Sequence, residues 1–585
     1  MPEIPLGGQS VLLHLRELEY SMKLLDREKK KINADVEHLI KLFIMPDSPD
    51  KFIEFGADLL DLIHNFFQEK GGIHSAISLN DLSKLFSDIN IPQESHLLKD
   101  VLHEIKTKLI AHSVKVGNPY YIGHMTSAIP YYMILLEMII AALNQNQVKI
   151  ESAKASTFLE REFVAWMHRL VFNKNPKFYR ANIQNRNIAL GTVTLDGTFA
   201  NLTALLVARN RAFPPDGDFP GIRDAGVYEA YKHYGYSKAV IIISQRGHYS
   251  IDKVSRIMGL GNNSVIKIPV DSGNKMDTRL LESKCEEIRI HNEKGADRVK
   301  IIAIVGIGGT TETGNVDNFR EIHRIAAKYD TFFHIDAAWG GGILIIEKYR
   351  HILDGIELAD SVSIDAHKLM YCPVSMGVAI FRDRKELNNI KHTSNYIIRP
   401  DSVDLGRFNI EGTRSFAVLK PWATFQVLGS GGFKLLFDHA FELTNRLSLL
   451  VELHPDFESM STPELFIFTY RFVPKRIQEK IQELMYNTSS EAETLSQISL
   501  LGKINLFLNE LNIELHKLIR EEDESFVSRT MYDSPKYFRQ DVVVLRTITV
   551  NPLTTSDILK EIIEQQGILG NKLYESEFAE RFEEI

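Results

Sequence analysis

The sequence predicts an α/β fold: a largely parallel sheet with helices on both faces, preceded by a helical segment and followed by an α+β domain. In the middle of the chain, strand-like apolar runs alternate with helical patterns, and this alternation is typical of a parallel sheet. The first part of the chain shows helical spacing of apolar residues without a strand pattern. With 585 residues, the chain exceeds the roughly 250–300 that one hydrophobic core usually serves, so we expect two or three domains.

The composition argues against several functional classes. The formal net charge is −8, so nothing favours a nucleic-acid or anionic membrane partner. Two cysteines, Cys285 and Cys372, exclude a disulfide framework and a Cys-based zinc site, and we expect no metal. The longest apolar run, 129–143, contains Glu137 and is too short to span a bilayer. Residues 1–10 lack the pattern of a secretory signal, and together these features predict a soluble, cytoplasmic protein.

The N-terminal segment, residues 1–117, is predicted to be helical. Ser48-Pro49 suits a helix start, because proline is tolerated in the first turn. The segment has no constellation of catalytic residues, so we interpret it as a packing or dimerisation segment. Its apolar residues follow helical spacing at Leu12, Leu15, Leu18, Phe52, Phe55, Leu59, Leu62, Ile63 and Phe66.

Residues 118–405 are predicted to form the large α/β domain. An aromatic-rich turn at 118–127 comes first, and helices follow at about 130–147 and 152–173. Strand-like runs then alternate with helical patterns. These runs are 189–195, 239–243, 265–270, 301–306, 331–335, 361–364 and 377–381.

Residues 406–585 are predicted to form a smaller α+β domain. A helical stretch at 414–428 is interrupted by the glycine-rich residues 429–432. Helices near 433–453 and 491–519 then flank strand-like runs at 465–472 and 542–550.

Two strand ends carry residues that suit one cofactor. Asp336 follows the apolar run 332–335, and His367-Lys368 follow the run 361–364. Because ligands bind outside the carboxyl ends of strands in an open α/β sheet, we expect Asp336 and Lys368 to lie near one another. Pyridoxal phosphate needs a lysine for a Schiff base and an anion beside its pyridinium nitrogen. A buried Asp–Lys ion pair without any cofactor is the alternative interpretation.

Glycine and hydroxyl residues follow two other strands. Asp196-Gly197-Thr198 opens the helix that starts at Phe199, and backbone N–H groups there can bind an anion. Gly308 to Thr311 closes another strand in the same way. Both could be plain turns. His248 lies beyond the strand 239–243, where its imidazole could stack on a flat ring or serve a structural role.

This set of residues, together with the segment His334 to Trp339, resembles the group II pyridoxal-phosphate decarboxylases, which have the type I aminotransferase-like fold. The resemblance covers residues 115–430 well and the C-terminal domain loosely. It implies that Lys368 forms the Schiff base, Asp336 pairs with the ring nitrogen and His248 stacks on the ring. The cofactor-binding residues that it implies are Gly197, Thr198, Phe199, His248, Thr311, Asp336, Ala338, His367 and Lys368.

Two further matches favour decarboxylation over transamination. Residues 395–400 resemble the family's mobile catalytic loop, which implies that Tyr396 protonates the substrate carbon after CO₂ leaves. Gly412-Thr413-Arg414 resembles the segment whose arginine binds the substrate carboxylate. A surface aromatic loop and a helix-start arginine are the alternative interpretations. Asp365 stands where many relatives have Asn, and it would repel a phosphate dianion unless it were protonated or turned away.

The resemblance also implies a substrate. The segment with Tyr121, His124 and Thr126 faces the substrate side chain in relatives, and the polar residues that receive a glutamate side chain are not evident at Ile122 and Gly123. The sequence most resembles the bacterial aspartate 1-decarboxylase branch, so we expect a carboxy-lyase that converts L-aspartate to β-alanine and CO₂. Glutamate is the second choice, and aromatic or sulfinic amino acids are less favoured. A transaminase or C–S lyase is the alternative of another class. We expect a homodimer with shared active sites, without nucleic-acid or membrane partners.

Overall fold

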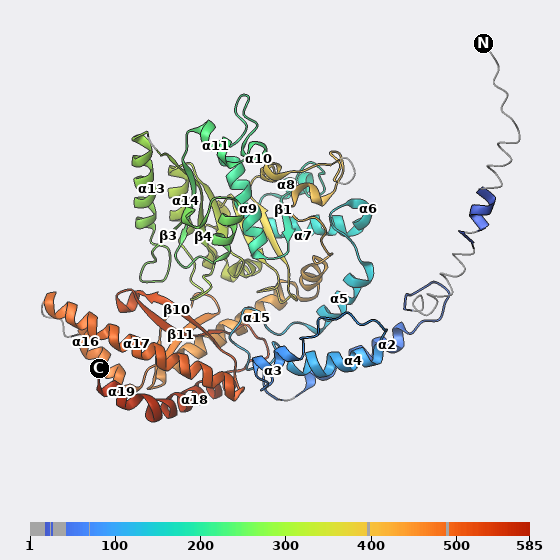
Figure 1. Ribbon diagram of the computed structural model, residues 1–585. Helices are drawn as coiled ribbons and strands as arrows, with labels where there is room; N and C mark the ends of the chain where they lie inside the picture. Colours follow the sequence, from blue (N-terminus) through green and yellow to red (C-terminus); the bar gives the residue numbers. More distant parts are fainter. Residues whose placement is uncertain are drawn as a thin grey trace, which may run out of the picture. The chain divides into compact units, whose positions relative to one another are not determined.

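The computed structural model (Figure 1) divides into two compact units. One comprises the described residues up to Gly71 together with Leu79–Ser113, and the other comprises Gly72–Ser78 and Val114–Ile585. The proposed boundary at 405 falls inside the second unit. The structure describes residues 18–23, 25–26, 42–69, 71–295, 297–394, 398–486 and 491–585.

The first unit is helical in its described residues. It contains α2 (Phe52–Gln68), α3 (Leu79–Lys84) and α4 (Leu98–Glu104), which continues into a π-helical turn at Ile105–Leu109. None of these helices buries a side chain. The described residues confirm helices in this part of the chain, whereas the predicted helical positions Leu12 and Leu15 lie outside the described residues.

The second unit is built on a seven-stranded sheet with the strand order β1-β7-β6-β5-β4-β2-β3. All pairings from β3 to β6 are parallel, whereas β7 is antiparallel to both β6 and β1. The prediction of a largely parallel sheet is confirmed. The strands are β1 (Gly191–Thr194), β2 (Lys238–Ser244), β3 (Val265–Ile268), β4 (Val299–Ile307), β5 (Phe332–Asp336), β6 (Ser361–Asp365) and β7 (Gly377–Phe381).

Helices cover both faces of this sheet because its strands are apolar on both sides (Figure 1). Along β2, Val240 and Ile242 join one core, whereas Ile241 and Ile243 join the other, as the two-residue period of a strand requires. The first core also contains side chains of α7 (Ala155–Phe172), α13 (Thr278–Glu293) and α14 (Phe319–Lys328). The second contains side chains of α9 (Gly197–Ala212) and α12 (Ser250–Ile257).

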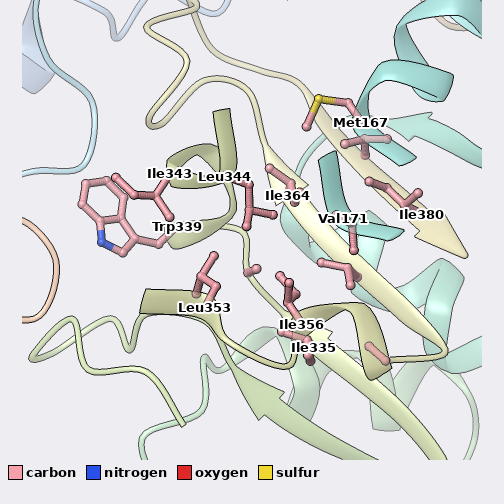
Figure 2. Packing of buried hydrophobic residues seen from close by; sticks show 14 of the residues in the cluster. Met167, Val171, Ile335, Trp339, Ile343, Leu344, Leu353, Ile356, Ile364 and Ile380 are labelled. Carbon is pink, nitrogen blue, oxygen red and sulfur yellow. The ribbon is translucent and has the colours of Figure 1, made fainter. Parts of the chain in front are cut away.

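The connection from β5 to β6 consists of the short 3₁₀ helices Gly340–Ile345, Glu347–Leu353 and Ile356–Leu358. Figure 2 shows Leu344, from the first of these, near Ile364 of β6. A Cβ at Gly341 would lie 2.5 Å from Cγ1 of Ile364, so only glycine allows the chain to pass this close. The connection thus returns to the sheet and leaves the ends of β5 and β6 side by side.

A four-stranded antiparallel sheet, in the order β10-β11-β9-β8, lies in the C-terminal part. The predicted strands correspond to β9 (Ile467–Phe472) and β11 (Gln540–Ile548), whereas β8 (Phe457–Ser459) and β10 (Ser528–Ser534) were not predicted. Helices α16 (Lys475–Tyr486), α17 (Glu491–Glu522) and α18 (Ser556–Leu573) accompany this sheet. Side chains of α17 and α18 share a hydrophobic core with it.

Helix α15 (Leu419–Leu453) connects the two sheets. Its side chains Phe433 and Phe437 lie in the core of the large sheet, and Leu443 and Leu447 lie in the core of the small one. The predicted interruption is a kink at Gly429, with φ 56° and ψ −179°. The predicted start at 414 was too early, because the helix begins at Leu419.

The apolar run near residue 130 forms α5 (Tyr131–Leu143), which ends at Asn144 in the left-handed conformation. Within the described parts of the chain, no helix is both long and apolar enough to cross a membrane.

Candidate active site

Asp336 and Lys368 lie at the same edge of the large sheet, as predicted. β5 and β6 are parallel neighbours, and Asp336 at the end of β5 pairs in register with Ser363 of β6. Lys368 follows three residues after β6 ends. Its ammonium, however, contacts Asp365, with Nζ 3.0 Å from Oδ2.

The carboxylate of Asp336 is held by three hydrogen bonds. Asn201 of α9 donates from Nδ2 to Oδ2 at 2.8 Å, and the backbone N–H of Ala338 donates to Oδ1 at 3.1 Å. Ser363 donates a longer bond of 3.3 Å to Oδ1. Asp336 is 7% exposed. A fixed, nearly dry carboxylate is the group that can hold a proton on a pyridine nitrogen.

Asn201 is itself fixed by further partners. Its Oδ1 accepts hydrogen bonds from Ser363 at 2.7 Å and from Nε2 of His334 at 2.9 Å. Ser361 Oγ lies 2.8 Å from the other ring nitrogen of His334. Burial lowers the pKa of His334 to about 4, so this imidazole is neutral near pH 7 and acts as a donor to Asn201. We call Asp336, Asn201, His334, Ser361 and Ser363 the Asp336 network.

The N-terminus of α9 lies beside these strand ends. A Cβ at Gly197 would lie 3.0 Å from Cβ of Ala338 and 2.9 Å from Oδ2 of Asp365, so a side chain at this position would be crowded by these two neighbours. Asp196 caps the helix, because its side chain accepts a hydrogen bond from the backbone N–H of Phe199 at 3.0 Å. The backbone N–H groups of Gly197 and Thr198 are then the ones that can bind an anion.

The turn after β6 brings two more charged groups to this place. Asp365 is buried, and its Oδ2 lies 3.7 Å from Nε2 of His367. Its Oδ1 is buried without a hydrogen-bond partner. Burial raises the pKa of Asp365, while Lys368 and His367 oppose this shift. His367 is held at its other nitrogen, because the backbone N–H of Met376 donates to Nδ1 at 3.2 Å.

His248, after β2, belongs to the same cluster. Burial lowers its pKa. The negative charges of Asp336 and Asp365 oppose this shift, and the positive charge of Lys368 adds to it. The backbone N–H of Ser250 lies 3.3 Å from its Nδ1. A neutral imidazole near Lys368 is compatible with ring stacking, which stays a prediction.

The segment with Tyr121, His124 and Thr126 runs along the small sheet. Ile122 exchanges backbone hydrogen bonds with Phe526 and Ile548, and Tyr121 stacks on Phe526 at 4.6 Å between ring centroids. Nδ1 of His124 lies 2.7 Å from Oγ1 of Thr126.

The segment also lies near the strand ends that carry Lys368. Burial lowers the pKa of His124, and the positive charges of Arg546, Lys368 and His367 lower it further. Their influence places His124 in the cluster, although its role toward a substrate stays a prediction.

Arg546 of β11 is a site residue that the sequence analysis missed. Its Nε donates to the carbonyl of Thr311 at 2.7 Å, and its Nη1 donates to the carbonyl of Gly123 at 3.4 Å. Nη2 is buried without a partner. Burial lowers the pKa of Arg546 to about 10, so the guanidinium is still charged near pH 7. An arginine inside the apolar run 542–550 was the signal available in the sequence.

Glu312, next to Thr311, faces Arg546. Its Oε2 is buried without a partner. Burial raises its pKa, and the charges of Arg246 and Arg546 oppose this shift. Among the described residues, this part of the site therefore contains two ionisable side chains that each have a buried polar atom without a partner.

Arg414, which was predicted to bind the substrate carboxylate, already has a carboxylate partner. Its Nη1 and Nη2 donate to the two oxygens of Glu160 in α7 at 3.1 and 2.6 Å. Both side chains are buried. The predicted role is untested, but this pair occupies the guanidinium fork. Tyr396, the predicted proton donor, lies outside the described residues.

Comparisons with known proteins match this arrangement. Residues 81–473 match the pyridoxal-dependent decarboxylase conserved domain. The chain is 37% identical over 547 residues to an aspartate 1-decarboxylase of Aliivibrio fischeri, which covers 93% of this chain and 96% of the relative. An L-2,4-diaminobutyrate decarboxylase of Acinetobacter baumannii is 27% identical over 65% of this chain and 72% of the relative. The solved structure of Oryza sativa TDC with PLP and tryptamine has a TM-score of 0.74 at 17% identity, covering 91% of this chain and all of that one.

The residues of the site fit the cofactor of this family, pyridoxal phosphate. Lys368 supplies an amine, Asp336 supplies a fixed anion, and Gly197 opens a helix whose N-terminus lies close to Ala338 and Asp365. The family match and the relative named as a decarboxylase make the protein a carboxy-lyase that acts on an amino acid. The chain belongs to the pyridoxal-dependent decarboxylase family.

Proposed function

We propose that this decarboxylase removes the α-carboxyl group of L-aspartate as CO₂ and leaves β-alanine. The observation that carries the proposal is the 37% identity, over 93% of the chain, to a relative named as an aspartate 1-decarboxylase. Arg546 supports an acidic substrate. Its charged guanidinium has a buried N–H group without a partner, and a carboxylate is the ligand that such a group binds best.

The cofactor, when bound, supplies the electron sink for the pair that is released from the substrate Cα. Lys368 would hold it through the ε-amine, and Asp336 would keep a proton on its ring nitrogen. The N–H groups of Gly197 and Thr198 would bind its phosphate. His248 would cover one face of the ring and exclude water from it. Phe199, Thr311, Ala338 and His367 complete the proposed cofactor-binding set.

Lys368→Ala tests the anchor. The variant should lose the visible absorbance band of the bound cofactor and the borohydride-trapped adduct, because no amine stands in its place. Lys253→Ala, at an exposed lysine of α12, is the matched control and should keep both. Persistence of the band and adduct in Lys368→Ala would mean that another lysine is the anchor.

A panel of substrates tests the specificity. We expect the highest kcat/KM for CO₂ release with aspartate, above glutamate, cysteine sulfinate, tyrosine and dopa, with β-alanine formed in equal amount to CO₂. Transfer of the amino group to a keto acid, or release of a thiol, without CO₂ would indicate a transaminase or a C–S lyase and overturn the proposal.

One observation favours a second substrate, L-2,4-diaminobutyrate. The buried Glu312 has a carboxylate oxygen without a partner, which could accept a hydrogen bond from a cationic side chain. A relative at 27% identity is named as a decarboxylase of this amino acid. The panel should therefore include it, and a higher kcat/KM with it than with aspartate would replace the first choice.

Tyr396 is proposed to give the proton that the substrate Cα takes up after CO₂ has left, and to act across a homodimer interface. Tyr396→Phe should bind cofactor and substrate but form less β-alanine per CO₂ released. Mixed dimers of Lys368→Ala and Tyr396→Phe subunits should regain up to one working site of two. Normal product yield from Tyr396→Phe removes the proton-donor role, and no recovery in verified mixed dimers removes the shared site.

A further inference from the structure

The carboxyl group of Asp365 lies beside the first residue of α9, next to the helix terminus where an anion is proposed to bind. Its Oδ2 lies 2.9 Å from the position of a Cβ at Gly197, and its Oδ1 lies 2.7 Å from that of a Cβ at Gly377. The group is therefore enclosed between the first residue of α9 and the first residue of β7. The carboxyl group is therefore next to the helix terminus, although Oδ1 accepts no hydrogen bond from any described residue.

Charged groups approach Asp365 from several elements. Lys368 and His367 belong to its own turn, with Nζ at 3.0 Å and Nε2 at 3.7 Å from Oδ2. The negative charge of Asp336, at the end of β5, raises the pKa of Asp365. The negative charge of Asp365 in turn raises the pKa of His248, after β2. On the α9 side, Asp196 is directed to the N–H of Phe199, and Gly197 and Gly377 carry no side chain.

Only one of its two oxygens is satisfied. Oδ2 contacts the ammonium of Lys368, whereas Oδ1 is buried and has no hydrogen-bond partner among the described residues. A buried acceptor without a donor destabilises the folded state. Condensation of the lysine amine with the cofactor would remove the ammonium that Oδ2 now contacts. A phosphate dianion beside the remaining carboxylate would then place like charges in a dry site.

We propose that binding of the cofactor phosphate is coupled to the uptake of one proton by Asp365. The protonated carboxyl then donates a hydrogen bond where the charged form would repel the dianion. This inference rests on the proposed placement of the phosphate at Gly197 and Thr198. Burial, which raises the pKa of Asp365, makes the protonation easier. Cofactor affinity is thereby linked to pH through a residue that does not touch the substrate.

The test measures proton uptake when pyridoxal phosphate binds to the apoprotein. Calorimetric titrations at pH 7.5 in buffers of different ionisation enthalpy give the number of protons taken up. Pyridoxal, which lacks the phosphate, is titrated in the same way and accounts for protons linked to Lys368. The wild-type protein should take up about one proton more when it binds pyridoxal phosphate than when it binds pyridoxal. As the pH rises by one unit, its affinity for pyridoxal phosphate should therefore fall by up to about tenfold more than its affinity for pyridoxal.

Asp365→Asn should abolish that difference and bind pyridoxal phosphate more tightly above pH 7.5, because an amide donates without titrating. Asp218→Asn, at an exposed aspartate, is the matched control and should behave as the wild type. The ³¹P chemical shift of the bound cofactor should report a dianion in both the wild type and Asp365→Asn.

Equal proton uptake with the two aldehydes overturns the inference, and this comparison needs only the wild-type protein. A phosphate monoanion in the ³¹P spectrum also overturns it, because the proton would then lie on the phosphate. If the wild-type protein binds no pyridoxal phosphate and releases no CO₂, the proposed function itself fails, and the two failures are thus distinguishable.

Discussion

The residues around Asp336 and those around Arg546 differ in how their polar atoms are satisfied. Within the Asp336 network, every side chain has hydrogen-bond partners inside the protein. Around Arg546, by contrast, its Nη2 and the Oε2 of Glu312 are buried without partners. Buried polar groups are normally paired, so the first region is complete in itself, whereas the second has the unused groups that a ligand would satisfy.

The largest effect is expected from Asp336→Asn, in the complete region. The amide keeps the shape of the carboxylate but cannot hold a positive charge on the ring nitrogen. We expect kcat to fall by at least about 100-fold with cofactor still bound. The melting temperature should also fall, because the amide NH₂ would face a hydrogen-bond donor and one buried bond would be lost at a cost of about 1–3 kcal/mol. Steady-state kinetics and a thermal melt measure both. A variant within tenfold of the wild type would show that the network is structural only.

Arg546→Lys tests the incomplete region. A lysine cannot keep the bonds to Thr311 and Gly123 and also offer a further N–H donor, so we expect KM for the substrate to rise by about 10- to 100-fold while cofactor content stays the same. The matched variant is Arg414→Lys, which removes the paired hydrogen bonds from the guanidinium to Glu160. It should lower the free energy of unfolding by about 1–3 kcal/mol without changing KM. If Arg414→Lys raised KM and Arg546→Lys did not, the earlier assignment of Arg414 to the substrate would be restored.

Asn201→Ala tests how far the network supports Asp336. It removes the partner that Asp336, His334 and Ser363 share, so we expect unfolding to become easier by about 2–4 kcal/mol and kcat to fall by about tenfold. Denaturant unfolding and kinetics at saturating cofactor measure the two effects. Asn388→Ala, at an exposed position, should change neither. A stable Asn201→Ala protein with wild-type kcat contradicts a positioning role.

The smallest effect is expected from Glu312→Gln. Burial raises the pKa of Glu312 in the folded protein, so the folded state binds more protons than the unfolded state between the two pKa values, and stability falls as pH rises through that window. The neutral amide should remove this slope and raise the melting temperature at pH 8 by no more than about 2 °C. The gain should vanish near pH 4. Melts across this pH range would disprove the effect if the two proteins kept parallel curves.

Much of the large sheet could be predicted from the sequence because its strands are buried on both faces. Runs such as 239–243 are continuously apolar and are recognised without knowledge of their neighbours. β10 was missed because only Tyr532 and Ser534 are buried along it, as in an edge strand with a polar pattern. β8 has three residues, which is too short for a periodic signal.

The site was predictable where its chemistry is local. Asp336 and Lys368 were found because each follows its own strand, and the pairing of β5 with β6 brings them together. Arg546 depends on the approach of Gly123 and Thr311, and Arg414 depends on Glu160, 254 residues away. These contacts join residues far apart in the sequence and arise only from the tertiary fold, so a local motif could not reveal them.

The hydrogen bond from Arg546 to Gly123 spans 423 residues of sequence, and this has a consequence for protein synthesis. At about 5–20 residues per second, a ribosome needs roughly 20–80 s between these two positions. The seven strands of the large sheet are complete once Phe381 has been made, whereas the segment 118–127 must wait for β10 and β11. The part of the site that would recognise the substrate is therefore the last to assemble on a newly made chain.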